Sequence, residues 1–139
     1  MEEGGGFEVL PIGVVRSSIL SRKWAPRQGF AGGVEAWVEL DGRYAEGLLG
    51  IEPGVEVVLV TWLHQSVRDV LRVHPKWRPE LPLTGVFFTR SPDRPNPLGL
   101  HRVRVLEMEG TRLKVGPLEV VDGTPVVDIK AVLEGEWDA

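Results

Sequence analysis

Short strand-like segments recur along this chain between glycine and proline turns, and helical periodicity is almost absent. The 17 glycines and 11 prolines are spread through all 139 residues, and both residue types interrupt helices. Val34 to Leu40 alternates apolar and polar side chains, which is typical of a strand with one buried face. Glu56 to Leu63 is apolar on both faces, so we expect a central or covered strand there. About seven such strands predict a mainly-β, single-domain β-barrel over residues 1–139.

One short helix is expected at Arg43 to Leu49, because Gly50 can close it in the left-handed conformation. In Leu100 to Glu107, apolar positions and His101 alternate with Arg102 and Arg104, so we expect both arginines to lie outside the barrel on one stripe. The remaining strands are expected at Phe7 to Val15, Gly85 to Thr89, Thr111 to Val115 and Val126 to Val132.

Several classes of protein are excluded by residues that the chain lacks. The absence of cysteine excludes disulfides, thiolate zinc sites and a cysteine nucleophile. The three histidines lack metal-ligand spacing, so we expect no metal. No phosphate loop, dinucleotide fingerprint or serine-nucleophile elbow is present. The longest nearly apolar run, Val57 to Leu63, is too short to span a bilayer, and no apolar signal core follows Met1. We therefore expect a cytoplasmic protein with no membrane partner.

Charge is unevenly distributed along the chain. The formal net charge is -4, which is not typical of a nucleic-acid-binding protein. Trp62 to Arg104, however, contains eight basic and three acidic residues, a net charge of +5, and the remainder is therefore at -9. One interpretation is a locally basic face on an acidic protein. The other is a chance bias that folding spreads over scattered surfaces.

The segment from Thr89 to Gly99 concentrates polar side chains in a proline-stiffened stretch. Each proline restricts its own backbone and that of the preceding residue, so Arg94 and Asn96 are held before any ligand arrives. Arg90 and Arg94 can each grip a carboxylate or phosphate with two hydrogen bonds. We favour a binding role for this loop over a rigid surface loop with solvated arginines.

Three further clusters carry weaker signals. Asp122 to Lys130 reads first as a turn entering a strand; the alternative is that Asp122 lies at the strand mouth, where its carboxylate could hold an amine or a ribose diol. Asp128 and Lys130 lie on the same side of the strand, and a structural ion pair is their simplest role. Ala25 to Gly29 offers an arginine and an amide in a proline-set loop. Trp62 to Gln65 places His64 at the end of a buried strand, where a structural role is the common alternative to catalysis.

These stretches resemble the TrmO/TsaA family, class VIII-type β-barrel methyltransferases that use S-adenosylmethionine and act on tRNA. The long string from Thr89 to Leu100 is very specific, and the matching pieces occur in the family's order over nearly the whole chain. They are Pro11 to Ser17, Pro26 to Gln28, Trp62 to His64, Gly85 to Leu100 and Asp122 to Lys130.

The resemblance implies N6-methylation of N6-threonylcarbamoyladenosine, beside the tRNA anticodon, by a homodimer. By position it implies that S-adenosyl-L-methionine contacts a defined set of residues, of which Leu100 and Glu119 to Val121 carry no chemical signal of their own. The set is Pro26, Arg27, Gln28, His64, Gln65, Arg90, Leu100, Glu119, Val120, Val121 and Asp122.

Methylation of an adenine N6 needs a group that accepts a proton, and Asp122 and His64 are our candidates for this catalytic role. Arginines that neutralise phosphates would hold the RNA. For Trp77, base stacking stands beside a core or dimer contact as an equal alternative. The expected substrate contacts are Arg94, Asn96, Arg102 and Arg104, together with the loop from Arg68 to Arg78.

The chain also departs from the family. It stops nine residues after Lys130, where the better-known bacterial members continue into a small C-terminal domain, and Ala131-Val132 replaces a usual Pro-Tyr. We interpret it as a compact form. The departure and the net negative charge favour a second function, a sensor or regulatory barrel that binds S-adenosylmethionine without methylating tRNA. The basic segment favours the methyltransferase.

Overall fold

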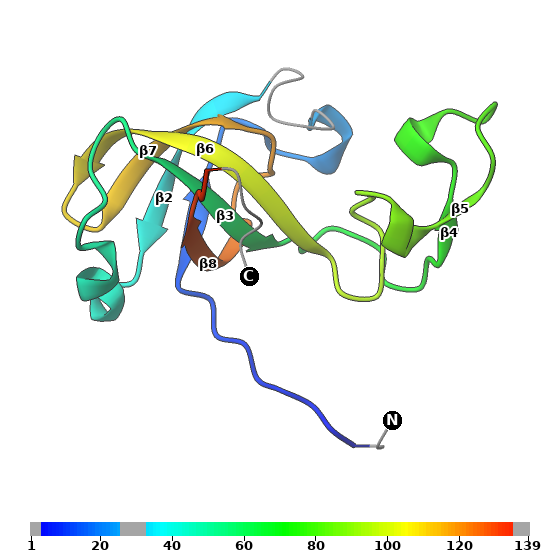
Figure 1. The fold of residues 1–139 in the computed structure, drawn as a ribbon, viewed down its shortest axis with the longest axis horizontal. Coiled ribbons are helices and arrows are strands. Elements are labelled where there is room, and N and C mark those ends of the chain that lie inside the picture. Colours follow the sequence, from blue (N-terminus) through cyan, green and yellow to red (C-terminus); the bar gives the residue numbers. More distant parts are fainter. Residues whose placement is uncertain (1–3, 26–32, 135–139) are drawn as a thin grey trace.

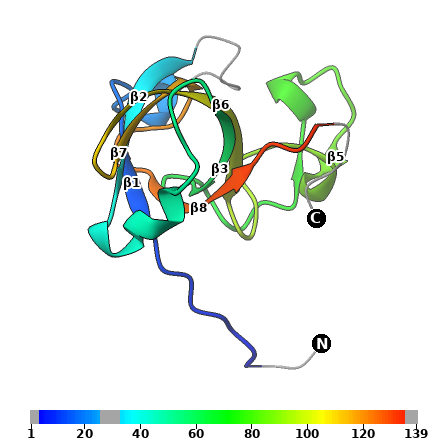
Figure 2. The ribbon, with the colours of Figure 1, turned by 60° about the vertical axis from the view of Figure 1, so that its left-hand side comes forward.

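Six strands close a barrel in the computed structural model, which describes residues 4–25 and 33–134. The predicted mainly-β barrel is therefore confirmed, with six strands in the barrel wall in place of about seven (Figures 1 and 2). Around the barrel the order is β1-β2-β7-β6-β3-β8, and each neighbouring pair of strands is antiparallel. The strands are β1 (Gly13–Arg16), β2 (Val34–Leu40), β3 (Glu56–Trp62), β6 (Leu98–Glu109), β7 (Arg112–Leu118) and β8 (Pro125–Ala131).

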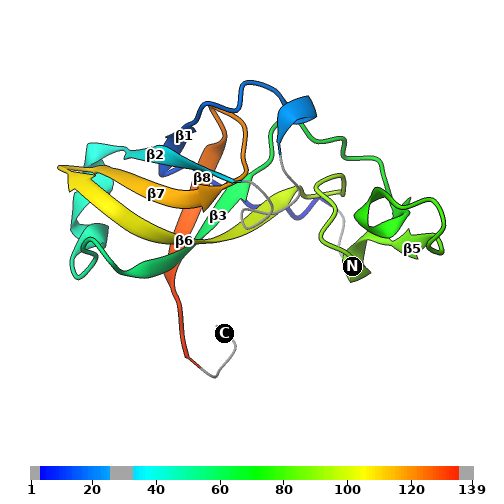
Figure 3. The same cartoon turned by 90° about the horizontal axis from the view of Figure 1, so that it is seen from above.

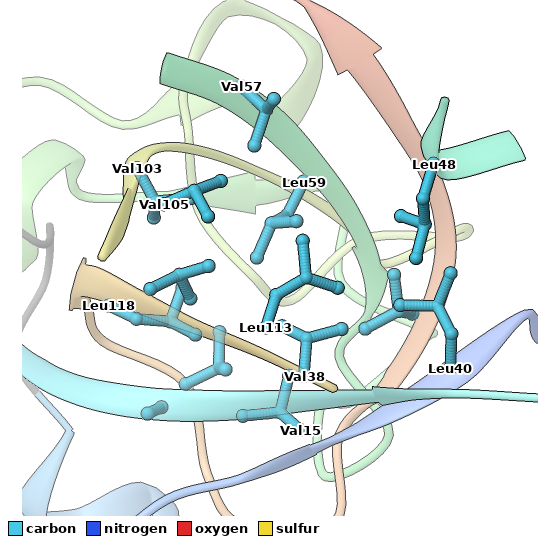
Figure 4. Close-up of a cluster of buried hydrophobic side chains, with 14 residues drawn as sticks. Val15, Val38, Leu40, Leu48, Val57, Leu59, Val103, Val105, Leu113 and Leu118 are labelled. Carbon is cyan, nitrogen blue, oxygen red and sulfur yellow. The ribbon is translucent and has the colours of Figure 1, made fainter. Parts of the chain in front are cut away.

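Alternation along the strands places the core as the sequence predicts. In β2 the side chains of Ala36, Val38 and Leu40 are buried and point into the barrel. β3 lies between β6 and β8, which confirms its central position. Its inward residues are buried, whereas its outward apolar residues are only half-buried. The barrel interior is thus one aliphatic cluster built from all six strands, with Leu48 added from outside the wall (Figure 4).

Short 3-10 helices complete the barrel. The expected helix is η3 (Gly42–Leu48), in which the Asp41 carboxylate caps the start by accepting from the Arg43 amide. Leu48 is its buried residue and anchors the helix on the core. In the part of the chain that the structure describes, single turns also lie at η1 (Arg22–Trp24), η4 (Pro75–Trp77) and η5 (Val86–Phe88). Among the described residues no helix is long and apolar enough to cross a membrane.

Two strand predictions were wrong. The first strand begins at Gly13, and Phe7 is almost fully exposed, because within the described ranges no strand pairs with the chain before Ile12. The segment from Gly85 to Thr89 has only one strand residue, Gly85, and then turns through η5. There the Val86 carbonyl accepts from the Thr89 amide and hydroxyl, which closes a turn instead of a ladder.

A lobe formed by residues 64–97 projects from one end of the barrel (Figures 1 and 3). Its two short strands, β4 (Arg72–Val73) and β5 (Thr84–Gly85), pair only with each other. β3 enters the lobe and β6 leaves it, so the lobe is an excursion between two neighbouring barrel strands. The proline-stiffened segment from Thr89 to Gly99, called the Arg90 loop below, lies in the return half of this excursion and runs into the first two residues of β6.

Candidate functional site

Asp93 anchors the proline-stiffened segment to the rest of the protein. Its carboxylate accepts a hydrogen bond from the Val67 amide at 2.9 Å and one from Arg22 Nη2 at 2.5 Å. Burial alone raises the pKa of Asp93, but these hydrogen bonds outweigh it and hold that pKa below its usual range. Arg22 also binds Gln65, donating from its amide to the side-chain oxygen and from Nη1 to the carbonyl. The segment, η1 and the end of β3 therefore form one connected unit.

The side chain of Arg94 is hydrogen-bonded within the lobe, to carbonyls just before it in the chain. Its guanidinium donates to the carbonyl oxygens of Val86, Thr89 and Ser91. Three carbonyls satisfied by one planar cation fix the loop's curvature, and they leave that cation little capacity for a ligand. The structure therefore assigns Arg94 a scaffolding position; as a substrate contact it stays a prediction.

Asn96 is likewise tied to the scaffold. Its side-chain oxygen accepts from Arg68 Nη2 at 3.0 Å, and Arg68 Nε donates to the Pro95 carbonyl. The Arg68 guanidinium lies 5.0 Å from the centre of the Trp62 ring, within cation–π range. This contact joins the end of β3 to the end of the loop.

Arg90 and His64 differ from these residues. Both are exposed, and neither makes a hydrogen bond or ion pair with another residue in the described ranges. Arg90 is thus an unpaired cation on a backbone that its neighbours hold rigid. Such a cation is pre-organised for an anionic group.

The connection between β7 and β8 forms the second side of the site. The Asp122 carboxylate accepts from the Ser17 amide at 3.0 Å, and the Asp122 amide donates to the Ile19 carbonyl at 2.7 Å. The side chains of Val120 and Val121 are buried, so at these two positions the backbone is the part that can face a ligand. Gly123 has a φ of 84°, a conformation that glycine adopts without strain and that turns the chain into β8.

Residues 17–22 bring the two sides together. Ser17 and Ile19 bind Asp122, whereas Arg22 binds Gln65 and Asp93. Figure 3 shows η1 at the end of the barrel that carries the lobe. Leu100, just after the loop, is 49% exposed on the outer face of β6. The predicted cofactor contacts Pro26, Arg27 and Gln28 follow η1 in the chain and lie outside the described residues.

Arg102 and Arg104 lie exposed on the outer face of β6, as the alternation predicts. Both are ion-paired with Glu56 on β3, at 2.5 Å and 2.9 Å, and Arg104 also donates to the Gly54 carbonyl. The hydrogen bond from Arg102 lowers the pKa of Glu56. A groove of about 550 Å³ runs past these residues and Glu35, and it includes none of the predicted cofactor contacts.

Sequence reasoning missed the residues that hold the site together. Arg22 and Ser17 lie in a stretch without periodicity, and their partners are 43 to 105 positions away. It also missed the buried contact between His101 and Glu119. His101 stood on the apolar face of a predicted strand, and a polar residue in that position was the available signal.

The chain matches the tRNA-methyltransferase O N-terminal domain over residues 14–137. A protein named S-adenosyl-L-methionine-binding protein from Archaeoglobus fulgidus is 45% identical over 120 residues, which cover 86% of this chain and 85% of the relative. A probable S-adenosyl-L-methionine-binding protein from Methanothermobacter thermautotrophicus is 40% identical over 128 residues, 92% of this chain and 91% of the relative.

Solved structures agree with this match. The crystal structure of TrmO from Pseudomonas aeruginosa superposes with a TM-score of 0.76 at 32% identity, covering 99% of this chain and 62% of that one. A second TrmO crystal structure gives a TM-score of 0.75 at 33% identity, covering 97% of this chain and 62% of the other. The fold and these matches thus place the chain in a class of β-barrel methyltransferase domains. The protein belongs to the tRNA-methyltransferase O N-terminal domain family.

Proposed function

We propose that this protein is an enzyme that transfers the methyl group of S-adenosyl-L-methionine to N6 of N6-threonylcarbamoyladenosine in tRNA. S-adenosyl-L-methionine is the cofactor, on the strength of the family and of the relatives named for binding it. The observation that carries the proposal is Arg90. It is an exposed cation without a partner among the described residues, in a loop that the rest of the site rigidly supports.

The residues present fit this cofactor. Its carboxylate needs a cation, and Arg90 is unpaired. Its adenine needs an apolar surface, and Leu100 is half-exposed beside the loop. Its amino group needs acceptors, which the carbonyls of Glu119, Val120 and Asp122 can supply, whereas that of Val121 already accepts from Thr124. When bound, the cofactor supplies a methyl group on a positively charged sulfur, and the protein contributes mainly position.

We propose Asp122 and His64 as the candidates for taking the proton that leaves N6. His64 is exposed and unpaired in the described structure, so it is free to accept a proton in its neutral form. Asp122 already accepts from the Ser17 amide through one oxygen, which orients its carboxylate and leaves the second oxygen for another partner. The two groups are distinguished by comparing the pH–rate profiles of H64A and D122N.

The proposed tRNA surface extends from the lobe to β6. Arg72 and Lys76 are exposed without a partner among the described residues, which makes them stronger candidates for phosphate contacts than Arg102 and Arg104. Those two arginines share Glu56, so a phosphate has to compete with an existing ion pair. Arg94 and Asn96 are proposed to support the RNA side of the site through the loop backbone.

We also propose that the protein is a homodimer. Phe87 and Phe88, next to Arg90 in sequence, are 80% and 89% exposed, and exposed neighbouring aromatic side chains are typical of protein interfaces. A second copy is the occupant that we expect. Light scattering at micromolar concentration should give twice the chain mass. A monomer at that concentration would contradict the proposal.

The second candidate function is a barrel that binds S-adenosyl-L-methionine as a sensor without methylating tRNA. The names of the archaeal relatives, which specify binding only, favour it. The test is transfer of labelled methyl groups to total tRNA, followed by nucleoside analysis. We expect label in N6-methylated threonylcarbamoyladenosine. Cofactor binding without any transfer to tRNA would favour the sensor.

A further inference from the structure

A polar network is buried inside the barrel wall close to the site. Thr61 of β3 is fully buried, and the side chains of His101 and Glu119 are only 4% and 12% exposed. The Thr61 hydroxyl and His101 Nε2 are 2.6 Å apart, and His101 Nδ1 contacts a Glu119 carboxylate oxygen. An ionised carboxylate only accepts, so Nδ1 carries a proton and Nε2 accepts from the Thr61 hydroxyl when the ring is neutral.

The order hydroxyl, imidazole, carboxylate is that of a hydrolase triad, but burial excludes that role. Thr61 has no exposed surface, so no substrate reaches its hydroxyl. The backbone is built around the contact instead. A Cβ at Gly99, the partner of Thr61 across the strands, would lie 2.6 Å from both His101 Nε2 and the Thr61 hydroxyl oxygen. Only glycine at this position leaves room for the hydrogen bond.

The contact replaces backbone pairing that ends nearby. The register between β6 and β7 stops at Arg104 and Gly116, so among the described residues the first part of β6 pairs only with β3. Glu119 follows the last residue of β7 and begins the connection to β8. Its carboxylate therefore ties the β7–β8 connection to β6 where the ladder no longer does.

His101 in this way connects the two sides of the site. It stands one residue after Leu100, at the exit of the Arg90 loop, and its ring holds Glu119 at one end of the segment 119–122. The other end is held by the hydrogen bonds between Asp122 and residues 17 and 19. We propose that His101 is a positioning residue for cofactor binding: through the Glu119 carboxylate it holds segment 119–122 against the Arg90 loop. This rests on the proposed function.

The test compares H101L, which removes both hydrogen bonds, with H101N, whose amide can still donate to Glu119. V105A is the matched control, because Val105 is fully buried on the same strand and face but away from the segment. Calorimetry should show that H101L binds S-adenosyl-L-methionine about tenfold more weakly, as expected for one lost charge-assisted hydrogen bond. H101N should stay within about threefold of wild type. V105A should lower the melting temperature without changing affinity.

Hydrogen exchange supplies a readout that a general loss of stability does not reproduce. The amides of Asp122, Gly123 and Thr124 donate to Ile19, Val15 and Val121, and H101L should accelerate their exchange without accelerating that of β2. If H101L does not fold, the double variant H101L/E119M is measured instead, because replacing both partners of a buried hydrogen bond by apolar residues can leave the stability nearly unchanged. Its affinity should remain low.

Two failures are distinguishable. Wild-type protein that does not bind S-adenosyl-L-methionine overturns the proposed function and this inference together. Wild-type protein that binds it, with unchanged affinity and exchange in H101L or wild-type affinity in H101L/E119M, overturns only the inference.

Discussion

Replacing Arg90 by alanine should abolish most cofactor affinity and leave the fold intact. Arg90 makes no hydrogen bond or ion pair with the described residues, so its removal should change the free energy of unfolding by less than about 0.5 kcal/mol. A charge-assisted hydrogen bond to the cofactor carboxylate contributes about 1.5–3 kcal/mol. Affinity should therefore fall by about 10- to 150-fold, and the exposure of the site places the loss nearer the lower value.

The assay is calorimetric titration with S-adenosyl-L-methionine, run beside thermal unfolding of the same samples. R43A is the matched control, since Arg43 is an exposed arginine whose partner is the neighbouring Asp41, far from the Arg90 loop in sequence and fold. R43A should bind as wild type does. Equal affinities in R90A and wild type would remove Arg90 from the site and with it the observation that carries the proposed function.

Three further predictions concern charge and metal. D93N should lose about 1 kcal/mol of stability at pH 7, because it removes the ion pair between Asp93 and Arg22, which solvent only partly screens. The pKa of Asp93 is lowered in the folded protein, so this stabilisation is present above the ordinary pKa of 3.8 and is lost as the pH falls below it. In urea unfolding, the stabilities of wild type and D93N should therefore differ less at pH 3 than at pH 7. A difference that is the same at both pH values would contradict the assignment. The double variant R102E/R104E should weaken tRNA binding and flatten its salt dependence while cofactor affinity stays unchanged; tRNA binding indifferent to both reversals would favour the sensor function. Methyl transfer should survive a chelator; a loss restored by a divalent ion other than magnesium would show that a metal takes part.

Much of the barrel could be predicted from the sequence because strand alternation is a local property. β2 was predicted to the residue, and β3, β6 and β8 within two residues at each end. The strands that were predicted wrongly are those in which pairing with a neighbouring strand decides whether the segment becomes a strand. Phe7 to Pro11 has strand-like composition, but among the described residues no barrel strand pairs with it. Val86 to Phe88 is apolar, but hydrogen bonds to the Val86 carbonyl turn it.

In the candidate site, too, local properties could be predicted from the sequence, whereas long-range contacts could not. Prolines stiffen the segment from Thr89 to Gly99 through restrictions on single residues, so its rigidity was evident without a structure. Arg90 and Arg94 look equivalent in the sequence. Folding separates them, because the carbonyls that occupy Arg94 are brought to it by η5 and the loop, whereas Arg90 meets none.

His101 shows most clearly what the sequence determines and what the tertiary structure adds. The sequence by itself determined that His101 faces inward, because inward and outward positions alternate along a strand. Only the tertiary structure decided that this ring meets Thr61 and Glu119, since the three come from β3, β6 and the β7–β8 connection. Hydrogen bonds between residues 18 and 40 positions apart depend on strand register and barrel closure, which no local pattern encodes.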